Sequence, residues 1–383
     1  MPKKTAAFLF GSGISVASGA PRVTELTRSV IDSPWWFHTD EKFYPVTPER
    51  GFTSDETAAR AQNLIRILHD HITPVLLTHA RRTPNYEDYF SCLKQIVQHE
   101  TVEFINPIIS PSIAALKDAS SYLHVGHQAH IDGDPFVSLV DRASNLIQWV
   151  VFHALQPLSV PKSLDLLSSV ASKYGSLNIF SLNHDLLLEQ QLKSNRIKFS
   201  DGFGVYAGDA AAFTGAWNRS VRIYKLHGSV NWYYMRSRGT GANYYAKVDR
   251  NPDRAQGANT DVLSLLEPVP QFLTGTTVKE HSYGFGLFGK LFAEFRRRLQ
   301  ESSTLICSGY GWGDKGINIR IDEWLSEAPA NRVILLHGKK GEDLEVSTTF
   351  WWNRWKRYKK AGKVIRVPKW FSESTLADLS LYI

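Results

Sequence analysis

Six short apolar runs constrain the fold of this chain more than any other feature of its sequence. They are residues 5–10 (TAAFLF), 177–182 (LNIFSL), 221–226 (VRIYKL), 304–308 (TLICS), 332–337 (RVILLH) and 363–367 (KVIRV). Their near-continuous apolar character, with polar or helical segments between them, is typical of parallel strands buried on both faces. The sequence therefore predicts an α/β fold, in which helices flank a parallel sheet.

A long middle stretch of the chain has a different periodicity. From about Ser33 to Gly175, apolar residues recur at helical spacing, most clearly in residues 56–72 and 135–156. We expect residues 1–30 and 175–383 to form the sheet domain, with a large helical insert over 31–174. Residues 236–262 are rich in Gly, Asn, Arg and Asp and are expected to form a mobile surface loop.

Composition narrows the class of protein. The chain has 383 residues, of which 43% are hydrophobic and 21% charged, as in ordered globular proteins. No apolar run reaches the roughly 18 residues of a membrane span, and the N-terminal run is too short for a signal peptide, so we expect a cytoplasmic protein and no membrane partner. The net charge of +7 leaves direct nucleic-acid binding open.

The first apolar run is followed by a glycine-rich turn. It reads Gly11-Ser12-Gly13-Ile14-Ser15 and continues through Ser18, Gly19 and Pro21, with a helix expected to start near residues 15–18. Such a turn brings backbone N–H groups close to a pyrophosphate, although a plain strand-to-helix turn has the same composition. No acidic residue ends a second strand about 20 residues on, which disfavours a hydride-transferring enzyme.

Polar residues also follow three of the later runs. Asn183 and Asp185 follow the second run, and His227 and Gly228 follow the third. Ser308 ends the fourth, with Gly309, Asp314 and Asn318 beyond it. Taken singly, these are ordinary helix caps, structural histidines or turns. Taken together, they predict a ligand site, because ligands of open parallel sheets bind beyond the carboxyl ends of the strands.

The order of these four motifs resembles the sirtuin-like NAD-binding domain, over roughly residues 1–30 and 175–367. In that family a Gly-x-Gly-x-Ser loop, an Asn-x-Asp strand end, a Leu-His-Gly strand end and a late glycine-rich segment surround one NAD molecule. The resemblance implies a Rossmann-like sheet and NAD⁺ as the substrate.

The resemblance also assigns roles to the residues of the four motifs. It implies that Asn183 holds a water or ribose near the anomeric carbon and that Asp185 orients nicotinamide or the loop around it. It also implies that His227 takes the proton from a ribose hydroxyl or water. It places the remaining motif residues around NAD⁺, namely Gly11, Ser12, Gly13, Ile14, Ser15, Ser18, Pro21, Gly228, Ser308, Gly309, Asp314 and Asn318.

Two departures from the protein deacylases of the family indicate which branch of the family this chain resembles. Arg22-Val23-Thr24 follows Pro21 where deacylases keep Asp-Phe-Arg, and Cys92 and Cys307 are too few for the four-cysteine zinc module, so no metal is expected. Residues 85–90 (NYEDYF) resemble a stretch in the inserts of bacterial sirtuin-like antiphage effectors that destroy NAD⁺.

The leading hypothesis is therefore an NAD⁺ glycohydrolase that acts in antiphage defence. By family analogy, we expect a homo-oligomer controlled by a partner chain, for which a HerA-like ATPase or an Argonaute-type protein are candidates. The alternatives are a module that binds NAD⁺ or ADP-ribose without hydrolysis, a protein deacylase or ADP-ribosyl transferase, and a DNA-binding protein.

Three further features have mainly structural interpretations. His124, His127 and His130, with Asp132 and Asp134, recur in a glycine-containing stretch that favours a loop over a metal site. Trp351, Trp355 and Tyr358 share one face of a basic helix and are expected to pack in the core. The alternatives are a contact with another copy or a partner, and binding to nucleic acid or a membrane surface. Trp35, Trp36 and Phe37 are expected to pack or to cover the pocket.

Overall fold

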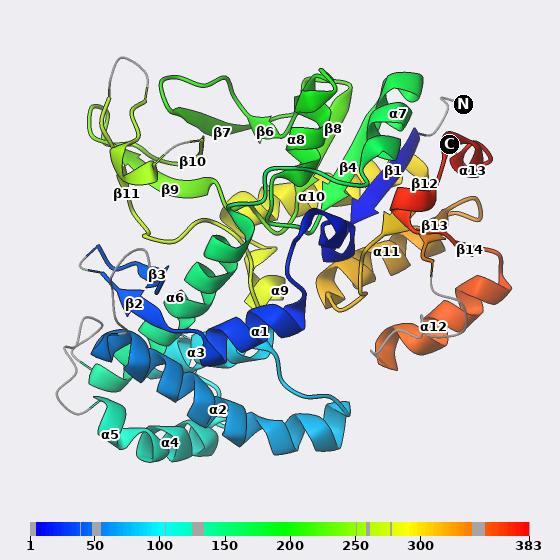
Figure 1. Cartoon of the computed structure of the whole chain (residues 1–383). Coiled ribbons are helices and arrows are strands. Elements are labelled where there is room, and N and C mark those ends of the chain that lie inside the picture. Colours follow the sequence, from blue (N-terminus) through cyan, green and yellow to red (C-terminus); the bar gives the residue numbers. More distant parts are fainter. Residues whose placement is uncertain are drawn as a thin grey trace. The chain divides into compact units, whose positions relative to one another are not determined.

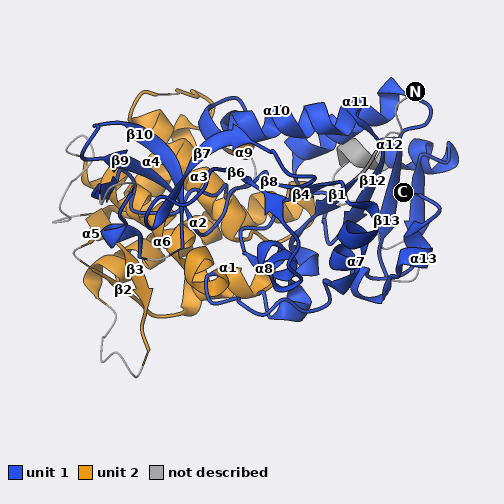
Figure 2. Ribbon diagram, turned by 90° about the horizontal axis from the view of Figure 1, so that it is seen from above, with its two compact units in different colours: residues 1–20, 156–273, 280–383 blue, residues 21–155, 274–279 orange. Residues whose placement is uncertain are grey.

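The computed structural model describes residues 5–38, 40–47, 55–103, 105–124, 134–249, 251–257, 261–275, 278–338 and 349–382. They form two compact units (Figures 1 and 2). Unit 1 comprises Met1–Ala20, Gln156–Leu273 and Glu280–Ile383, and unit 2 comprises Pro21–Leu155 and Thr274–Lys279.

Among the described residues of unit 1, seven parallel strands form one sheet in the order β14-β13-β12-β1-β4-β8-β5. The strands are β1 (Thr5–Phe10), β4 (Leu177–Ser181), β5 (Phe199–Ser200), β8 (Val221–Lys225), β12 (Ser302–Ser308), β13 (Arg332–Leu336) and β14 (Val364–Val367). All six predicted strands are confirmed, and β5 is a short addition at one edge. The fold is the predicted Rossmann-like α/β fold.

Both faces of this sheet are buried, and the strands alternate between two cores. In β1, Leu9 belongs to one core and Phe8 to the other. The Leu9 core is covered by α10 (Gly286–Gln300), α11 (Lys315–Glu327) and α12 (Thr349–Lys360). The Phe8 core is covered by α7 (Asp165–Tyr174), α8 (Leu187–Ser194), the 3-10 turn η6 (Phe371–Glu373) and α13 (Leu376–Leu379). Burial on both faces explains why the strands read as continuous apolar runs.

The unit boundaries differ from the predicted division of the chain. Unit 2 begins at Pro21 rather than at residue 31, and unit 1 resumes at Gln156 rather than at residue 175. The reason for the second difference is α7, whose Leu167 and Val170 are fully buried in the Phe8 core of the sheet. Helical periodicity marked α7 as a helix but could not show which unit its apolar face joins.

A second sheet in unit 1 corrects the loop prediction for residues 236–262. In the described part of the chain its strand order is β11-β9-β10-β7-β6, with antiparallel pairing. The strands are β6 (Gly202–Phe203), β7 (Ala210–Ala216), β9 (Trp232–Ser237), β10 (Asn243–Val248) and β11 (Leu263–Leu265). The 3-10 turn η4 (Pro252–Arg254) lies between β10 and β11. The glycine-rich composition of the turns hid the alternating pattern of β10, in which Ala246 and Val248 are buried.

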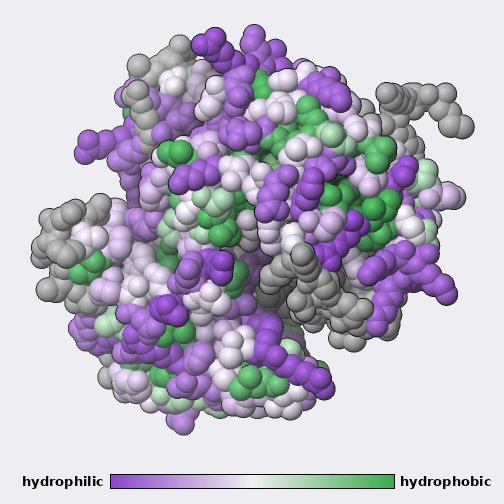
Figure 3. Space-filling view, turned by 45° about the vertical axis from the view of Figure 1, so that its right-hand side comes forward, coloured by the Kyte–Doolittle hydropathy of each residue, from purple (hydrophilic) through white to green (hydrophobic). Residues whose placement is uncertain are grey.

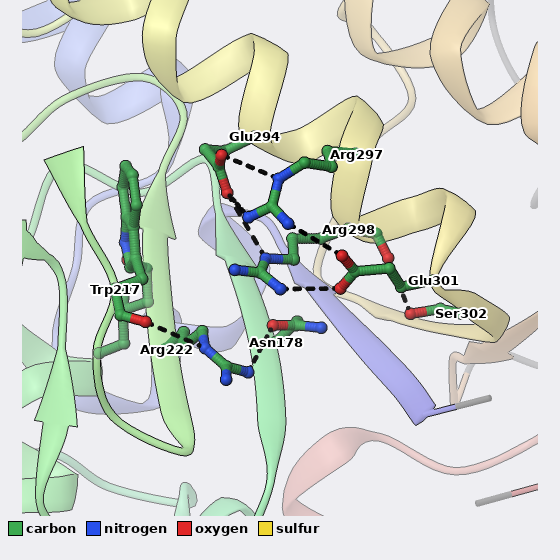
Figure 4. Close-up of polar contacts among 9 residues, drawn as sticks. Asn178, Trp217, Arg222, Glu294, Arg297, Arg298, Glu301 and Ser302 are labelled. Atoms are coloured by element: carbon green, nitrogen blue, oxygen red, sulfur yellow. Dashed lines mark hydrogen bonds and ion pairs between the residues drawn. The ribbon is translucent and has the colours of Figure 1, made fainter. Parts of the chain in front are cut away.

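Charged side chains pair at the end of the sheet where β4 and β8 begin (Figure 4). Arg297 and Arg298, in the last turn of α10, both bind Glu294 and Glu301. Arg222 donates to the Trp217 carbonyl at 3.3 Å. Two carboxylates therefore balance the charges of Arg297 and Arg298, which weakens the case for a phosphate-binding patch at these two residues.

Unit 2 is mainly helical. Its helices are α1 (Val23–Asp32), α2 (Glu56–Ala80), α3 (Tyr86–Glu100), α4 (Ser110–Ala119), α5 (Ser121–His124) and α6 (Pro135–Leu155). Helix α6 is apolar on most sides, and Val140, Ala143 and Ile147 are fully buried. A helix of this kind forms the centre of a unit, and α6 contacts α1, α2 and α3.

Two sequence features of unit 2 have structural roles. Asn85 caps α3 by accepting from Glu87 N at 2.9 Å, while Asp88 accepts from Asn85 N and binds Arg82. Trp35, Trp36 and Phe37 form strand β2 (Trp35–Phe37), which pairs with β3 (Phe43–Pro45). The NYEDYF stretch is thus a helix start, and the aromatic run is a strand.

The basic helix α12 packs its aromatic side chains into unit 1. Trp355 and Tyr358 are buried, and Tyr358 donates to Asp322 Oδ1 at 2.6 Å. This confirms the core interpretation for these two residues, and the side chain of Trp351 lies outside what the structure describes.

The face in Figure 3 mixes hydrophilic and hydrophobic residues. None of the described helices is long and apolar enough to cross a membrane.

Candidate functional site

The carboxyl ends of β1 and β12 lie side by side at the point where the strand order reverses. From β1 the chain adds β4 and later β8 on one side, and then returns to place β12 on the other side of β1. Ligands of open α/β sheets bind at such a switch point. The glycine-rich turns after β1 and β12 therefore border the crevice where a ligand is expected.

These two turns pack against each other through their backbones. Gly11 N donates to Ser308 O at 3.1 Å, and Gly13 N donates to Gly309 O at 2.9 Å. A Cβ at Gly11 would lie 2.6 Å from Gly309 O, and a Cβ at Gly309 would lie 2.5 Å from Ile14 N. Gly309 also has φ +66°. The glycines are required by this loop-to-loop contact, whatever ligand lies beyond them.

The helix expected near residues 15–18 is not an α-helix. Two 3-10 turns, η1 (Ser12–Ile14) and η2 (Val16–Ser18), follow β1, and the first α-helix begins only at Val23. Gly19, with φ +90°, ends the second turn, and Pro21 cannot continue it. The macrodipole of a long helix is therefore not aimed from this loop, and the backbone N–H groups of Gly11, Gly13, Ile14 and Ser15 are hydrogen-bonded within the protein.

Ser15, Asn183 and Asp185 form one buried hydrogen-bonded chain across β1 and β4. Asn183 Nδ2 donates to Ser15 Oγ at 2.9 Å, and Ser15 Oγ donates to Asp185 Oδ2 at 2.7 Å. Asp185 Oδ1 accepts from Leu187 N at 3.0 Å, next to the start of α8. The structure thus joins three of the predicted site residues from two motifs 168 or more positions apart.

Asn183 keeps one polar atom available. Its side chain is only 4% exposed, yet Oδ1 has no hydrogen-bond partner among the described residues. A buried amide oxygen without a partner is costly, and its position is held by the Nδ2 bond to Ser15. The atom is therefore set to accept a hydrogen bond from a ligand hydroxyl or a water.

A buried ion pair holds the backbone of Asp185, one member of this hydrogen-bonded chain. Lys225, the last residue of β8, lies 3.1 Å from Glu189 Oε1 in α8, and its ammonium also donates to the Asp185 carbonyl. The Lys225 side chain is 2% exposed and that of Glu189 10% exposed. The pair ties the Asp185 backbone to both β8 and α8, which fixes where its carboxylate lies.

His227 belongs to a second buried cluster, with Asp314 and Tyr283. His227 Nε2 lies 2.9 Å from Asp314 Oδ2 and 2.8 Å from the Tyr283 hydroxyl, which donates to the same Oδ2 at 2.6 Å. Asp314 Oδ1 caps α11 by accepting from Ile317 N at 3.0 Å. Both oxygens of Asp314 thus have hydrogen-bond partners within the protein, and one of these partners is the predicted base.

Gly228 permits another close backbone approach. It has φ +79°, and a Cβ there would lie 2.2 Å from Gln271 O. The neighbouring His227 O accepts from Leu273 N at 2.8 Å. The segment 271–273 therefore covers the backbone after β8 where the sequence analysis expected a ligand.

The other predicted binding residues have mixed positions. Asn318 Nδ2 donates to the Trp312 carbonyl, and its Oδ1 accepts from the Tyr310 hydroxyl. The side chain therefore stabilises the loop after β12. Ser308 Oγ donates to Leu336 O at 3.4 Å, and Ser18 Oγ accepts from Lys162 N at 2.8 Å. Ile14 is buried in the Phe8 core, whereas Ser12 and Gly13 are exposed. Pro21 is the first residue of unit 2.

The described residues contain no group of three or more metal-ligating side chains. His127, His130 and Asp132 lie outside the described residues. His124 bonds the Lys117 carbonyl, and Asp134 accepts from Phe136 N. Burial raises the pKa of the Cys92 thiol to about 11 and raises that of Cys307 further, so neither is a ready thiolate.

Sequence reasoning missed Tyr283, Lys225 and Glu189. Lys225 carried a usable signal, since it is the one charged residue near the end of an apolar strand that leads directly into His227. Tyr283 precedes α10 and carried no signal, because only the fold brings it to a strand end 56 positions away.

Together, the parallel sheet and the polar loops gathered at its switch point define a Rossmann-like α/β protein. Residues 177–356 match the SIR2-like domain family. Among solved structures, the chain is similar to one described as "Structural Basis for the Mechanism and Regulation of Sir2 Enzymes", with 10% identity, a TM-score of 0.38, and 97% of this chain and 89% of that chain covered. It is also similar to a Sir2 homolog–NAD complex, with 11% identity, a TM-score of 0.32, and 93% and 90% covered. No curated protein matches the sequence.

Proposed function

We propose that the chain is an NAD⁺ glycohydrolase, which converts NAD⁺ and water to nicotinamide, ADP-ribose and a proton. The SIR2-like match of residues 177–356 and the NAD complex among the similar structures support NAD⁺ as the ligand. The observation that carries the proposal is the buried, unpartnered Oδ1 of Asn183, held at the carboxyl end of β4.

Cleavage of the bond between nicotinamide and ribose needs little acid catalysis. Nicotinamide leaves as a neutral molecule when the bond between its ring nitrogen and the ribose C1′ breaks, and that carbon passes through an oxocarbenium-like state. What the site must supply is a fixed ribose and a positioned water. Asn183 Oδ1 accepts a hydrogen bond from that water, so the water's lone pair is directed at C1′.

His227 supplies the proton acceptor in this proposal. Water that adds to C1′ releases one proton, and an imidazole is suited to take it near neutral pH. The side chain is 6% exposed and is held by Asp314 and Tyr283. Asp185 acts through Ser15, whose hydroxyl fixes the Asn183 amide. The exposed Ser12 at the switch point supplies a backbone N–H group for the pyrophosphate.

The alternatives are separated by what happens to NAD⁺. A binding module would retain NAD⁺ or ADP-ribose and release no nicotinamide. A deacylase or ADP-ribosyl transferase would consume NAD⁺ only with an acceptor protein, and a DNA-binding protein would show retention on DNA that falls steeply with salt.

Incubation of the purified chain with NAD⁺, followed by chromatography of the products, tests the proposal. Free nicotinamide and ADP-ribose in equal amounts, with no acceptor added, are expected. Intact NAD⁺, both with the chain alone and with a candidate partner chain present, would contradict it.

We further propose, on the resemblance to antiphage effectors, that the hydrolysis depletes NAD⁺ during infection and that the chain is a homo-oligomer under the control of another chain. A HerA-like ATPase and an Argonaute-type protein are the candidate partners. Uncontrolled hydrolysis would kill the host, so uninfected cells that carry both chains should keep their NAD⁺. Loss of cellular NAD⁺ in uninfected cells that carry both chains would contradict this regulation.

A further inference from the structure

The cluster around His227 uses hydrogen bonds that determine which ring nitrogen carries the proton. An ionised carboxylate only accepts hydrogen bonds. Asp314 Oδ2, at 2.9 Å from His227 Nε2, therefore requires a proton on Nε2. The Tyr283 hydroxyl donates to the same oxygen at 2.6 Å, so its own oxygen accepts a share of the Nε2 proton at 2.8 Å.

Asp314 is itself held in place from two directions. Its Oδ1 accepts from Ile317 N, which fixes the carboxylate at the N-terminus of α11. The Tyr283 ring stacks on Phe292 of α10, with centroids 4.2 Å apart and planes at 6°. The cluster therefore joins the loop after β8 to helices α10 and α11 through groups that have little freedom to turn.

We propose that Asp314 and Tyr283 are positioning residues that fix His227 as the Nε2–H tautomer, which leaves the lone pair that takes the proton on Nδ1. This inference rests on the proposed function for its consequence in turnover, but the tautomer itself is a property of the free protein. Groups that face His227 include Asp314, Tyr283 and the His184 ring, whose centroid lies 6.2 Å from that of His227.

Asp314→Asn gives a sharp test, because asparagine caps helices as well as aspartate. Its Oδ1 continues to accept from Ile317 N, so its amide NH₂ faces His227 and donates to Nε2. The proton must then move to Nδ1. An Asp-to-Asn change behind the histidine of serine proteases selects the wrong tautomer in the same way.

The matched variant is Tyr283→Phe. It keeps the ring that stacks on Phe292 and removes only the hydroxyl. Because Asp314 stays ionised, we expect His227 to remain the Nε2–H tautomer, with NAD⁺ turnover reduced by less than about tenfold. In Asp314→Asn we expect the Nδ1–H tautomer and a loss of turnover of at least roughly a hundredfold.

The tautomer is read from the ring ¹⁵N chemical shifts of ¹⁵N-histidine-labelled full-length protein without NAD⁺, with the His227 signals assigned by their absence in His227→Gln. An Nδ1–H tautomer in the wild type, or an unchanged tautomer in Asp314→Asn, overturns the inference. So does full turnover in an Asp314→Asn protein that carries the switched tautomer. A wild-type chain that shows the Nε2–H tautomer but never consumes NAD⁺ contradicts the proposed function and leaves the tautomer assignment standing.

Discussion

Asp314 Oδ2 lies 2.9 Å from His227 Nε2, although β1 and β4 separate the strands that precede the two residues. Neighbouring strands are about 4.8 Å apart, so three spacings would place the strand ends roughly 14 Å from each other. The loop after β12 and the start of α11 cross that distance along the carboxyl edge of the sheet. The contact therefore links the loop after β12 to the loop after β8.

The contact between the glycine turns can be tested by one methyl group. In Gly11→Ala the new Cβ would lie 2.6 Å from Gly309 O, so the two loops must separate. We expect a loss of about 1–3 kcal/mol in the free energy of unfolding, measured by urea titration. Gly311→Ala is the control, since a Cβ there would meet no described atom within 4 Å, and its stability should stay within about 0.5 kcal/mol of wild type. Equal losses in both variants would refute the loop-to-loop explanation.

The buried pair of Lys225 and Glu189 predicts a specific pattern of stability. Lys225→Met leaves the Glu189 carboxylate buried without its cation, which should cost about 3–5 kcal/mol of unfolding free energy. Adding Glu189→Leu removes the stranded charge and should recover more than half of that loss. Denaturant unfolding of the two variants measures both values. A double variant less stable than Lys225→Met would show that the ion pair is not the source of the effect.

The NYEDYF stretch is expected to act through helix capping. Asn85→Ala removes the side-chain acceptor for Glu87 N and should lower the free energy of unfolding by about 1 kcal/mol. Asn85→Asp keeps an acceptor at this position and should stay close to wild type. Thermal unfolding of both variants gives the comparison, and identical midpoints for alanine and aspartate would exclude a capping role.

The two thiols should resist alkylation in the folded protein. Burial raises the pKa of Cys92 to about 11 and that of Cys307 still more. Because only the thiolate reacts, the reactive fraction of Cys92 at pH 7.5 is below about 0.1%. The alkylation rate of the folded protein should rise as the pH approaches the raised pKa. After unfolding, both thiols should react. Mass spectrometry after iodoacetamide treatment, with and without urea, measures this, and rapid labelling of the native protein at pH 7.5 would contradict it.

The sheet could be predicted from the sequence because burial on both faces leaves a direct mark. In β1, Phe8 and Leu9 face opposite cores, so residues 6–10 of the run are all apolar. The second sheet left a weaker mark, since its strands are short and its turns are rich in glycine. Residues 156–174 show the limit of periodicity, because an amphipathic helix such as α7 does not reveal which unit it covers.

The sequence predicted which polar residues lie at the strand ends, but not which hydrogen bonds they make. Strand-end positions identified Asn183, Asp185, His227 and Asp314, since parallel strands end at one edge. Their partners depend on contacts between distant segments. The bond between Asp314 and His227 joins residues 87 positions apart, and the role of the glycines became clear only once Gly11 and Gly309 were in contact.

The most direct measurement compares NAD⁺ hydrolysis by the wild-type chain with that by Asn183→Ala and His227→Ala, under conditions in which the wild type is active. Circular dichroism and unfolding midpoints establish that the variants are folded. We expect nicotinamide release by the wild type and a loss of at least about a hundredfold in each variant, because one removes the acceptor for the water and the other the acceptor for its proton. Unchanged nicotinamide release by folded His227→Ala or Asn183→Ala would contradict the account.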